Sequence, residues 1–149
     1  MFFRKIMKQN MTQEPIVYQT GTYVKLINKA EYCKSIIADG KELIVTGNES
    51  GELIVPELKD PKVYITFKEG ITNFSDVFFG CTKLTSVPAN LFANHPNATS
   101  FSGAFLRCTA LTAIPEDLFA NNQAAENFAW LFYNCRKLES IPEKLFANC

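Results

Sequence analysis

The sequence has no excess of charge of either sign. Lys and Arg together number 15, as do Asp and Glu, and the basic residues form no block. Proteins that bind nucleic acid or an anionic membrane surface usually carry a cluster of basic side chains. The balanced charge therefore argues against both partner classes, and we expect no nucleic-acid partner.

Long apolar runs are also missing. The first segment, MFFRKIMKQNMTQEP, has Arg4, Lys5 and Lys8, but no apolar run of secretory-signal length follows them. No later stretch is long enough to cross a bilayer as a helix. We therefore expect no membrane span, and we predict that residues 1–15 form a disordered leader.

The usual signatures of enzymes and metal sites are absent as well. The chain has no C-x-x-C pair, no glycine-rich phosphate loop and no G-x-S-x-G motif. Its single histidine, His95, lies between Asn94 and Pro96, and we expect it to be a solvated corner residue. We predict no catalytic residue, no cofactor and no metal, and hence no enzyme.

What the chain does contain is a repeat of 27 residues. FSDVFFGCTKLTSVPANLFANH (74–95) returns as FSGAFLRCTALTAIPEDLFANN (101–122) and as FAWLFYNCRKLESIPEKLFANC (128–149). We divide it into units at 74–100 and 101–127 and an incomplete unit at 128–149. One such unit buries too little apolar surface to fold alone, so successive units are expected to stack.

Within each unit, the local chemistry suggests extended edges and short helical corners. Pro115 cannot donate to a strand ladder and suits the first position of a helix, where Glu116 and Asp117 complement the positive helix end. Asn121 then suits the left-handed conformation that ends a helix. The predicted fold class is therefore an α/β repeat with short strands and short helical or 3-10 corners.

The pattern F-x-x-x-F-x-x-C-x-x-L-x-S-[IV]-P-x-x-L-F-x-N resembles the BspA-like leucine-rich repeats of surface proteins from gut Bacteroidales. The resemblance covers residues 62–149. It implies a right-handed leucine-rich-repeat solenoid over that range. By analogy, it implies an adhesion or protein-binding module at the cell surface or in secreted form.

The region before the repeats reads as β structure, and we predict that residues 16–61 form a β-rich N-terminal cap. The runs 23–27, 42–46, 52–56 and 63–67 are rich in β-branched and aromatic residues. The second and third of them flank GNESG, a loop suited to a hairpin. Residues 28–38 fit either a helical turn or a further strand, and residues 62–73 are expected to form a first, degenerate repeat.

Three cysteines share one column of the repeat: Cys81, Cys108 and Cys135. A spacing of 27 residues places them in a line instead of around a point, so we expect small buried thiols and not metal ligands. Cys149 lies in the column of His95 and Asn122, and we expect it to be exposed.

Equivalent positions that hold different residues in the three repeats are expected to face solvent, where a partner can contact them. Trp130, the only tryptophan, shares a column with Asp76 and Gly103. Its ring either anchors a protein or glycan partner or covers the end of the last repeat. A second candidate binding face comprises Thr85, Thr112 and Glu139, with Lys83 and Lys137.

Two functions follow from this sequence. The first is a non-enzymatic module for protein or glycan recognition at a cell surface or after secretion. The alternative is an intracellular scaffold derived from a truncated repeat protein, located in the cytoplasm. Because the array stops where a further half-repeat would begin, we also predict end-to-end self-association.

Overall fold

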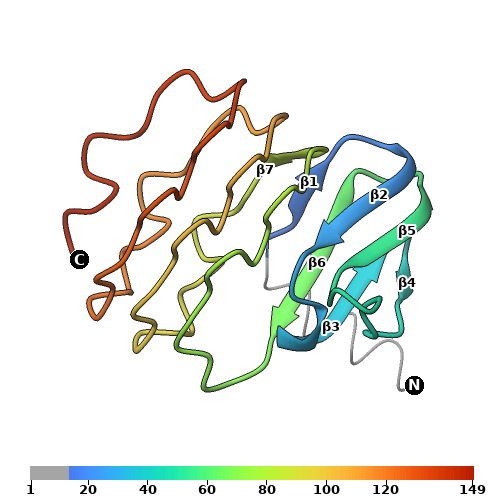
Figure 1. The fold of residues 1–149 in the computed structure, drawn as a ribbon, viewed down its shortest axis with the longest axis horizontal. Helices are drawn as coiled ribbons and strands as arrows, with labels where there is room; N and C mark the ends of the chain where they lie inside the picture. Colours follow the sequence, from blue (N-terminus) through green and yellow to red (C-terminus); the bar gives the residue numbers. More distant parts are fainter. Residues whose placement is uncertain (1–13) are drawn as a thin grey trace.

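The computed structural model describes residues 14–149. Its strands are β1 (Ile16–Tyr18), β2 (Gly21–Ile27), β3 (Cys33–Ala38), β4 (Lys41–Glu42), β5 (Leu53–Leu58), β6 (Lys62–Phe67) and β7 (Leu84–Ser86). Within the described range the only helical element is the 3-10 turn η1 (Ala30–Tyr32). Nearly all of the regular structure therefore lies in the first half of the chain (Figure 1).

These strands form two antiparallel sheets. One has five strands in the order β4-β3-β6-β1-β7, and the other pairs β2 with β5. Both sheets bury side chains in one hydrophobic core, and the Tyr18 hydroxyl of β1 donates a hydrogen bond to the Leu26 carbonyl of β2. We refer to β1 to β6 and their connections as the β-region.

The strand sequences explain which face each one buries. In β6, alternate residues Val63, Ile65 and Phe67 are buried, as the two-residue period of a strand requires. Pro56 lacks an N–H for a ladder and lies in the two-stranded sheet, where β5 pairs on one side only.

Several local expectations for the β-region need correction. Residues 42–46 and 52–56 do not form a hairpin with each other, since β4 pairs with β3 and β5 pairs with β2. Residues 28–38 contain both alternatives, the turn η1 and the strand β3. Within 62–73, residues 62–67 form β6 and pair with β3 and β1. Most of the predicted leader, residues 1–13, lies outside the described residues.

The three repeats, residues 74–149, stack side by side on one end of the β-region (Figure 1). Equivalent phenylalanine rings lie nearly parallel in three columns. Phe78 and Phe105 have ring centroids 5.5 Å apart, and Phe105 and Phe132 are 5.8 Å apart. The second column contains Phe74, Phe101 and Phe128, and the third contains Phe92, Phe119 and Phe146.

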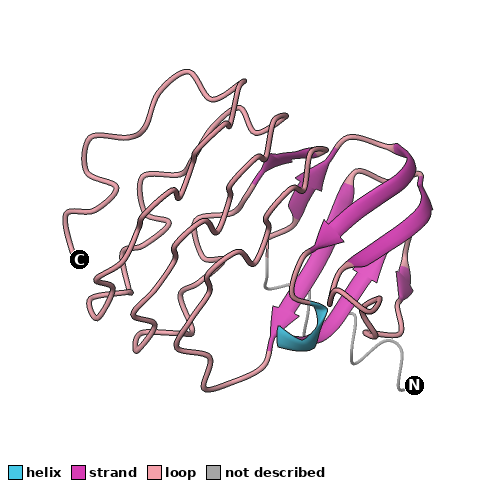
Figure 2. Ribbon diagram, in the orientation of Figure 1, coloured by secondary structure: helices cyan, strands magenta, loops and turns pink. Residues whose placement is uncertain are grey.

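The predicted α/β leucine-rich-repeat solenoid is nevertheless wrong. The described residues contain no α-helix, and the repeats are drawn almost wholly as loops and turns (Figure 2). After Pro115 the chain makes isolated turns, Leu118 N–H to Pro115 O and Ala120 N–H to Asp117 O, instead of a helix. The repeats contribute one strand, β7, and Ser100 makes two parallel bridges, to Asn127 and to Asn73, which directly precedes the first repeat.

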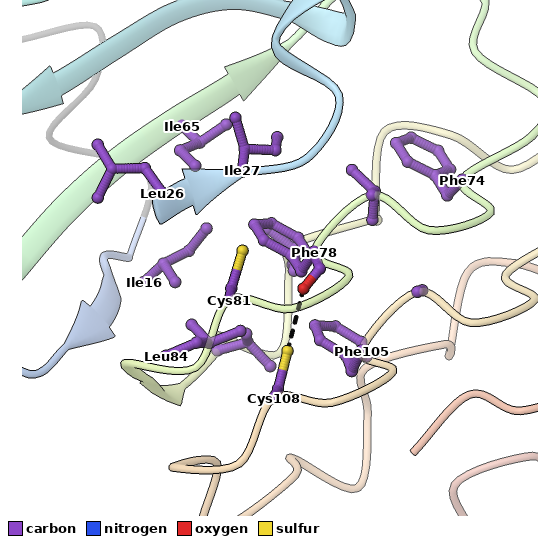
Figure 3. Close-up of a cluster of buried hydrophobic side chains, with 14 of the residues drawn as sticks. Ile16, Leu26, Ile27, Ile65, Phe74, Phe78, Cys81, Leu84, Phe105 and Cys108 are labelled. Atoms are coloured by element: carbon purple, nitrogen blue, oxygen red, sulfur yellow. Dashed lines mark hydrogen bonds between the residues drawn. The ribbon is translucent and has the colours of Figure 1, made fainter. Parts of the chain in front are cut away.

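The β-region and the repeats share a single core. β7 of the first repeat pairs with β1 and so completes the five-stranded sheet. Ile16, Leu26, Ile27 and Ile65 from the strands point toward Phe78, Cys81 and Leu84 of the repeats (Figure 3). The first repeat is thus covered on its inner side by the β-region.

Candidate recognition surface

The repeats are joined by main-chain hydrogen bonds, most of which run outward; a few run the other way, such as Thr112 N–H to Thr85 O. The N–H groups of Phe74, Asp76, Phe78 and Gly80 donate, at 2.8–2.9 Å, to the carbonyls of Ser100, Ser102, Ala104 and Leu106. In the same way, Phe101, Gly103, Phe105 and Arg107 donate to the carbonyls of Asn127, Ala129, Leu131 and Tyr133. We call these bonds the donor ladder. Each N–H points away from the β-region, toward the next repeat.

The donor ladder depends on residues in the left-handed backbone conformation. One column with positive φ contains Asp76 (59°), Gly103 (62°) and Trp130 (60°), and a second contains Gly80, Arg107 and Asn134. Asp and Asn tolerate this conformation better than most residues, whereas Trp and Arg rarely adopt it. Asn121, predicted to be left-handed, does not have a positive φ. The strained backbone positions, those with positive φ, therefore lie within the donor ladder and not at the ends of helices.

On the outer side of the third repeat the ladder has no continuation among the described residues. The N–H groups of Phe128, Trp130, Phe132 and Asn134 stand in the donor positions, and none has a partner within residues 14–149. We call the face formed by these four residues and Phe146 the open end. It lies at the opposite extreme of the molecule from the β-region (Figure 1).

Trp130 is exposed beside the open end. Its side chain has 65% of its surface accessible, and its ring meets the ring of Tyr133 edge-on with centroids 5.2 Å apart. Tyr133 is also exposed, at 56%. An exposed pair of aromatic rings is a common anchor for protein and sugar partners, since it offers apolar area at little entropic cost.

The second predicted face is only partly available. The Thr85 hydroxyl donates to the Val17 carbonyl at 2.9 Å, and the Lys83 carbonyl accepts the Gln19 N–H, so both residues serve the junction with β1. Thr112 and Glu139 are exposed, as is Lys137. Thr112 stays bonded to Thr85, since its N–H and its hydroxyl both donate to Thr85 O, at 3.1 and 3.3 Å.

The cysteine column is buried, as predicted. Cys81, Cys108 and Cys135 are all free thiols. Cys108 donates to the Phe78 carbonyl of the preceding repeat (Figure 3), and Cys135 donates to that of Phe105. Burial raises the pKa of the Cys81 thiol to about 12 and that of Cys135 to about 11. These thiols are therefore protonated near neutral pH and suited to packing and hydrogen bonding, not to nucleophilic attack.

His95 is buried, so the expectation of a solvated corner is wrong. Its ring packs edge-on against Phe74 with centroids 4.9 Å apart. Burial lowers the pKa of the imidazole. The adjacent Asn122 is also buried, and its amide donates to the carbonyls of Phe92 and His95. This column therefore links successive repeats, and Cys149 is exposed at its end.

The sequence interpretation missed the donor ladder and Tyr133. A signal for the left-handed columns was present, because Gly80 shares a column with Asn134 and Gly103 shares one with Asp76. Nothing in the sequence distinguished Tyr133 from its column partners Phe79 and Leu106, which are less exposed.

Comparisons with protein-family models, with curated proteins and with solved structures find no match. Across residues 14–149, no helix is long and apolar enough to cross a membrane, and no group of three or more His, Cys, Asp or Glu side chains is placed to hold a metal ion.

Proposed function

We propose that this chain is a non-enzymatic recognition module that binds a protein or a glycan at a cell surface or after secretion. The observation that carries the proposal is the exposed pair Trp130 and Tyr133 on the outermost repeat. Large aromatic side chains are costly to leave in water, and on a repeat protein they are typical of a binding face.

The cell-surface location rests on the resemblance of the repeat motif to those of BspA-like proteins. That support comes from the sequence motif alone, because the leucine-rich-repeat solenoid that the same resemblance implied is wrong. Adhesion is the activity that fits both the motif and the exposed aromatic pair.

The alternative, an intracellular scaffold, is favoured by a different observation. All five cysteines are free, four of them buried and Cys149 exposed. Unpaired cysteines are typical of reducing compartments, whereas exported proteins tend to carry disulfides. Treating intact cells of the source organism with an external protease distinguishes the two: the surface module is cleaved, and the scaffold is cleaved only after lysis.

Binding is tested on a panel of immobilised glycans and extracellular-matrix proteins. We expect Trp130→Ala to weaken any binding by at least about tenfold, the loss typical of an aromatic anchor. Tyr23→Ala is the matched control, because Tyr23 is an aromatic residue in β2 that is 81% exposed and lies in the β-region. An equal loss for both variants, or no binding to any member of the panel, would contradict the proposal.

The end-to-end self-association expected from the sequence stays a prediction. Light scattering over a range of concentrations measures whether the chain associates at all.

A further inference from the structure

One column of the repeats carries apolar side chains that stay in contact with solvent. It contains Phe79, Leu106 and Tyr133, of which the first two are half-buried and the third is 56% exposed. We call these three residues the apolar stripe. Phe79 and Leu106 are each followed by another repeat and still reach the surface. A further repeat stacked on the third would therefore lengthen the stripe and leave Tyr133 partly exposed, as Leu106 is.

A guanidinium group lies against this stripe. Arg107 follows Leu106 in the chain and is exposed, and its guanidinium carbon lies 5.9 Å from the centre of the Phe79 ring. No ion pair within residues 14–149 involves Arg107. Contact with a ring face leaves the N–H edge of a guanidinium open, and that edge matches the two oxygens of a carboxylate.

A second guanidinium is held one repeat further on. Arg136 is exposed, and its Nε donates to Oδ1 of Asn134 at 3.0 Å. Asn134 directly follows Tyr133 and has in the third repeat the position that Arg107 has in the second. Each of the two outer repeats therefore sets one guanidinium beside the stripe, and in the described part of the chain neither is paired with a carboxylate.

The other charged side chains near the stripe do not cancel these two. Lys25 Nζ lies 5.4 Å from the centre of the first ring of the stripe, but it is paired with Glu52 at 2.6 Å. Asp76 brings one carboxylate, whose Oδ1 would be only 2.4 Å from a Cβ atom added to Gly103. Two guanidinium groups and one carboxylate give this surface a net positive charge, in a chain whose net charge is zero.

The backbone at Arg107 is a further indication of a binding site. Its φ is 61°, and the equivalent residues are Gly80 and Asn134, which tolerate the left-handed conformation much better. Trp130, whose ring meets the last ring of the stripe, has a φ of 60° in the column of Gly103. Side chains kept in strained backbone conformations are concentrated at binding and active sites.

The stripe fits a chain of sugar rings better than an extended peptide. The N–H groups of its three residues already donate to carbonyls of their own turns, at 2.9–3.0 Å, so they cannot pair with a peptide main chain. An extended peptide places the side chains of one face roughly 6.8 Å apart. Equivalent rings of adjacent repeats are only 5.5–6.0 Å apart. Sugar rings need no main-chain donor, and their C–H faces pack on aromatic rings.

We propose that the apolar stripe binds an acidic glycan, a chain of linked sugar rings that carry carboxylates. The sugar rings pack along the stripe, and the carboxylates pair with the guanidinium groups of Arg107 and Arg136. This inference rests on the proposed function, because it names the ligand class of the recognition module. It also extends the contact surface from the third repeat back to Phe79 in the first.

The test uses the full chain and two probes, oligomers of galacturonic acid and of hyaluronan. The matched control for each is its methyl ester, which has the same sugar rings without the charge. We expect one of the acids to bind at least about tenfold more tightly than its ester in calorimetric titrations. Oligoglutamate of equal charge represents an acidic peptide, and it should bind at least about tenfold more weakly than that acid.

Arg107→Gly separates a role in binding from a role in the fold. Glycine relieves the left-handed backbone, as Gly80 does in the first repeat, so the melting temperature should not fall. Binding of the acid should weaken by at least about tenfold. Lys41→Gln is the matched control, because it removes one positive charge from an exposed residue of β4, in the β-region, and should leave binding unchanged.

Four results would overturn the proposal. Neither acid binds at millimolar concentration, or acid and ester bind equally. Lys41→Gln weakens binding as much as Arg107→Gly does, which indicates general charge attraction. Oligoglutamate binds as tightly as the acid, which identifies an acidic peptide as the occupant.

The acidic glycan and the recognition module can fail separately. Binding to a member of the panel that is lost in Trp130→Ala and unchanged in Arg107→Gly supports the recognition module and overturns the acidic glycan. The absence of binding to every panel member and to both acids overturns the two together.

Discussion

The β-region and the repeats pair their main-chain hydrogen-bonding groups in different ways. In the β-region, strands that are distant in sequence pair in antiparallel ladders, and the buried side chains are mostly aliphatic. In the repeats, neighbouring units are joined by main-chain hydrogen bonds that run mostly outward, and the core is built from stacked phenyl rings. The strands of the β-region pair with one another, whereas a stack of repeats can in principle be extended by a further unit.

That difference makes the two ends of the molecule unlike each other. The first repeat is covered by the β-region, with Asn28 bonded to its carbonyls. The third repeat has donors and rings on its outer face with no described partner. The comparison therefore predicts that substitutions inside the stack cost more than equivalent substitutions at its outer face.

The largest effect is expected for Phe105→Ala. Phe105 is fully buried between Phe78 and Phe132, with ring centroids 5.5 and 5.8 Å away. Removing the ring leaves a cavity within the column and should lower the free energy of unfolding by about 3–5 kcal/mol. Urea denaturation followed by circular dichroism measures this loss.

Phe146→Ala is the control at the outer face, because its ring is 40% exposed and stacks on Phe119 on one side only. We expect a loss of about 1–2 kcal/mol. Equal losses for the two variants would mean that the stack gains nothing from rings on both sides, against the comparison drawn above.

An intermediate effect is expected at alkaline pH. Burial raises the pKa of Cys81 in the repeats and of Cys33 in the β-region from the ordinary 9.0 to about 12. The unfolded chain loses these thiol protons above pH 9 while the folded chain retains them. The stability they contribute is therefore complete below pH 9 and is lost as the pH rises toward 12.

Free energies of unfolding measured between pH 8 and pH 11 test this predicted decline in stability. A Cys81→Ala variant should show a shallower decline than the parent chain, and so should Cys33→Ala, since both thiols are buried. Cys149→Ala should leave the decline almost unchanged because Cys149 is exposed. A slope that is the same in all four proteins would show that thiol burial does not govern it.

The smallest effect is expected where the two regions meet. The Asn28 side chain donates to Asp76 O and accepts from Lys25 Nζ at 2.9 Å. Asn28→Ala removes both bonds but keeps the main-chain bond to Val77, so we expect a loss of about 1 kcal/mol. Ile44→Ala, at a side chain that is 82% exposed, should change the stability very little.

Thermal unfolding of Asn28→Ala also reports on how the regions are coupled. A single sharp transition in this variant indicates that the shared core holds the regions together without Asn28. A transition that splits in two would show that the β-region and the repeats are joined mainly through this residue.

Much of the local pattern was predictable from the sequence. Of the predicted strand segments, 23–27 and 63–67 lie in β2 and β6 and 53–56 lies in β5, because alternation of apolar residues and β-branched composition reflect local backbone preference. Segment 42–46 was wrong, since only Glu42 lies in a strand. The 27-residue register correctly predicted stacked units and a buried thiol column, since residues that repeat at one spacing must meet the same environment.

The pairing of those segments was not predictable. Residues 42–46 and 52–56 look like a hairpin, yet their partners are β3 and β2, because pairing is decided by which faces can be buried together. The leucine-rich-repeat solenoid failed for a related reason. Pro115 and the acidic residues after it permit a helix, but the short corner forms separate turns that fit the stacking distance.

The sequence by itself determined that three equivalent units exist, which residues share a column, and that Trp130 breaks its column. Those facts follow from identity and spacing, which need no coordinates. Only the tertiary structure decided the direction of the donor ladder, the burial of His95 and the exposure of Tyr133. Each of these depends on how the backbone of one unit is oriented against the next. Packing between distant parts of the chain sets that orientation, and no single residue does.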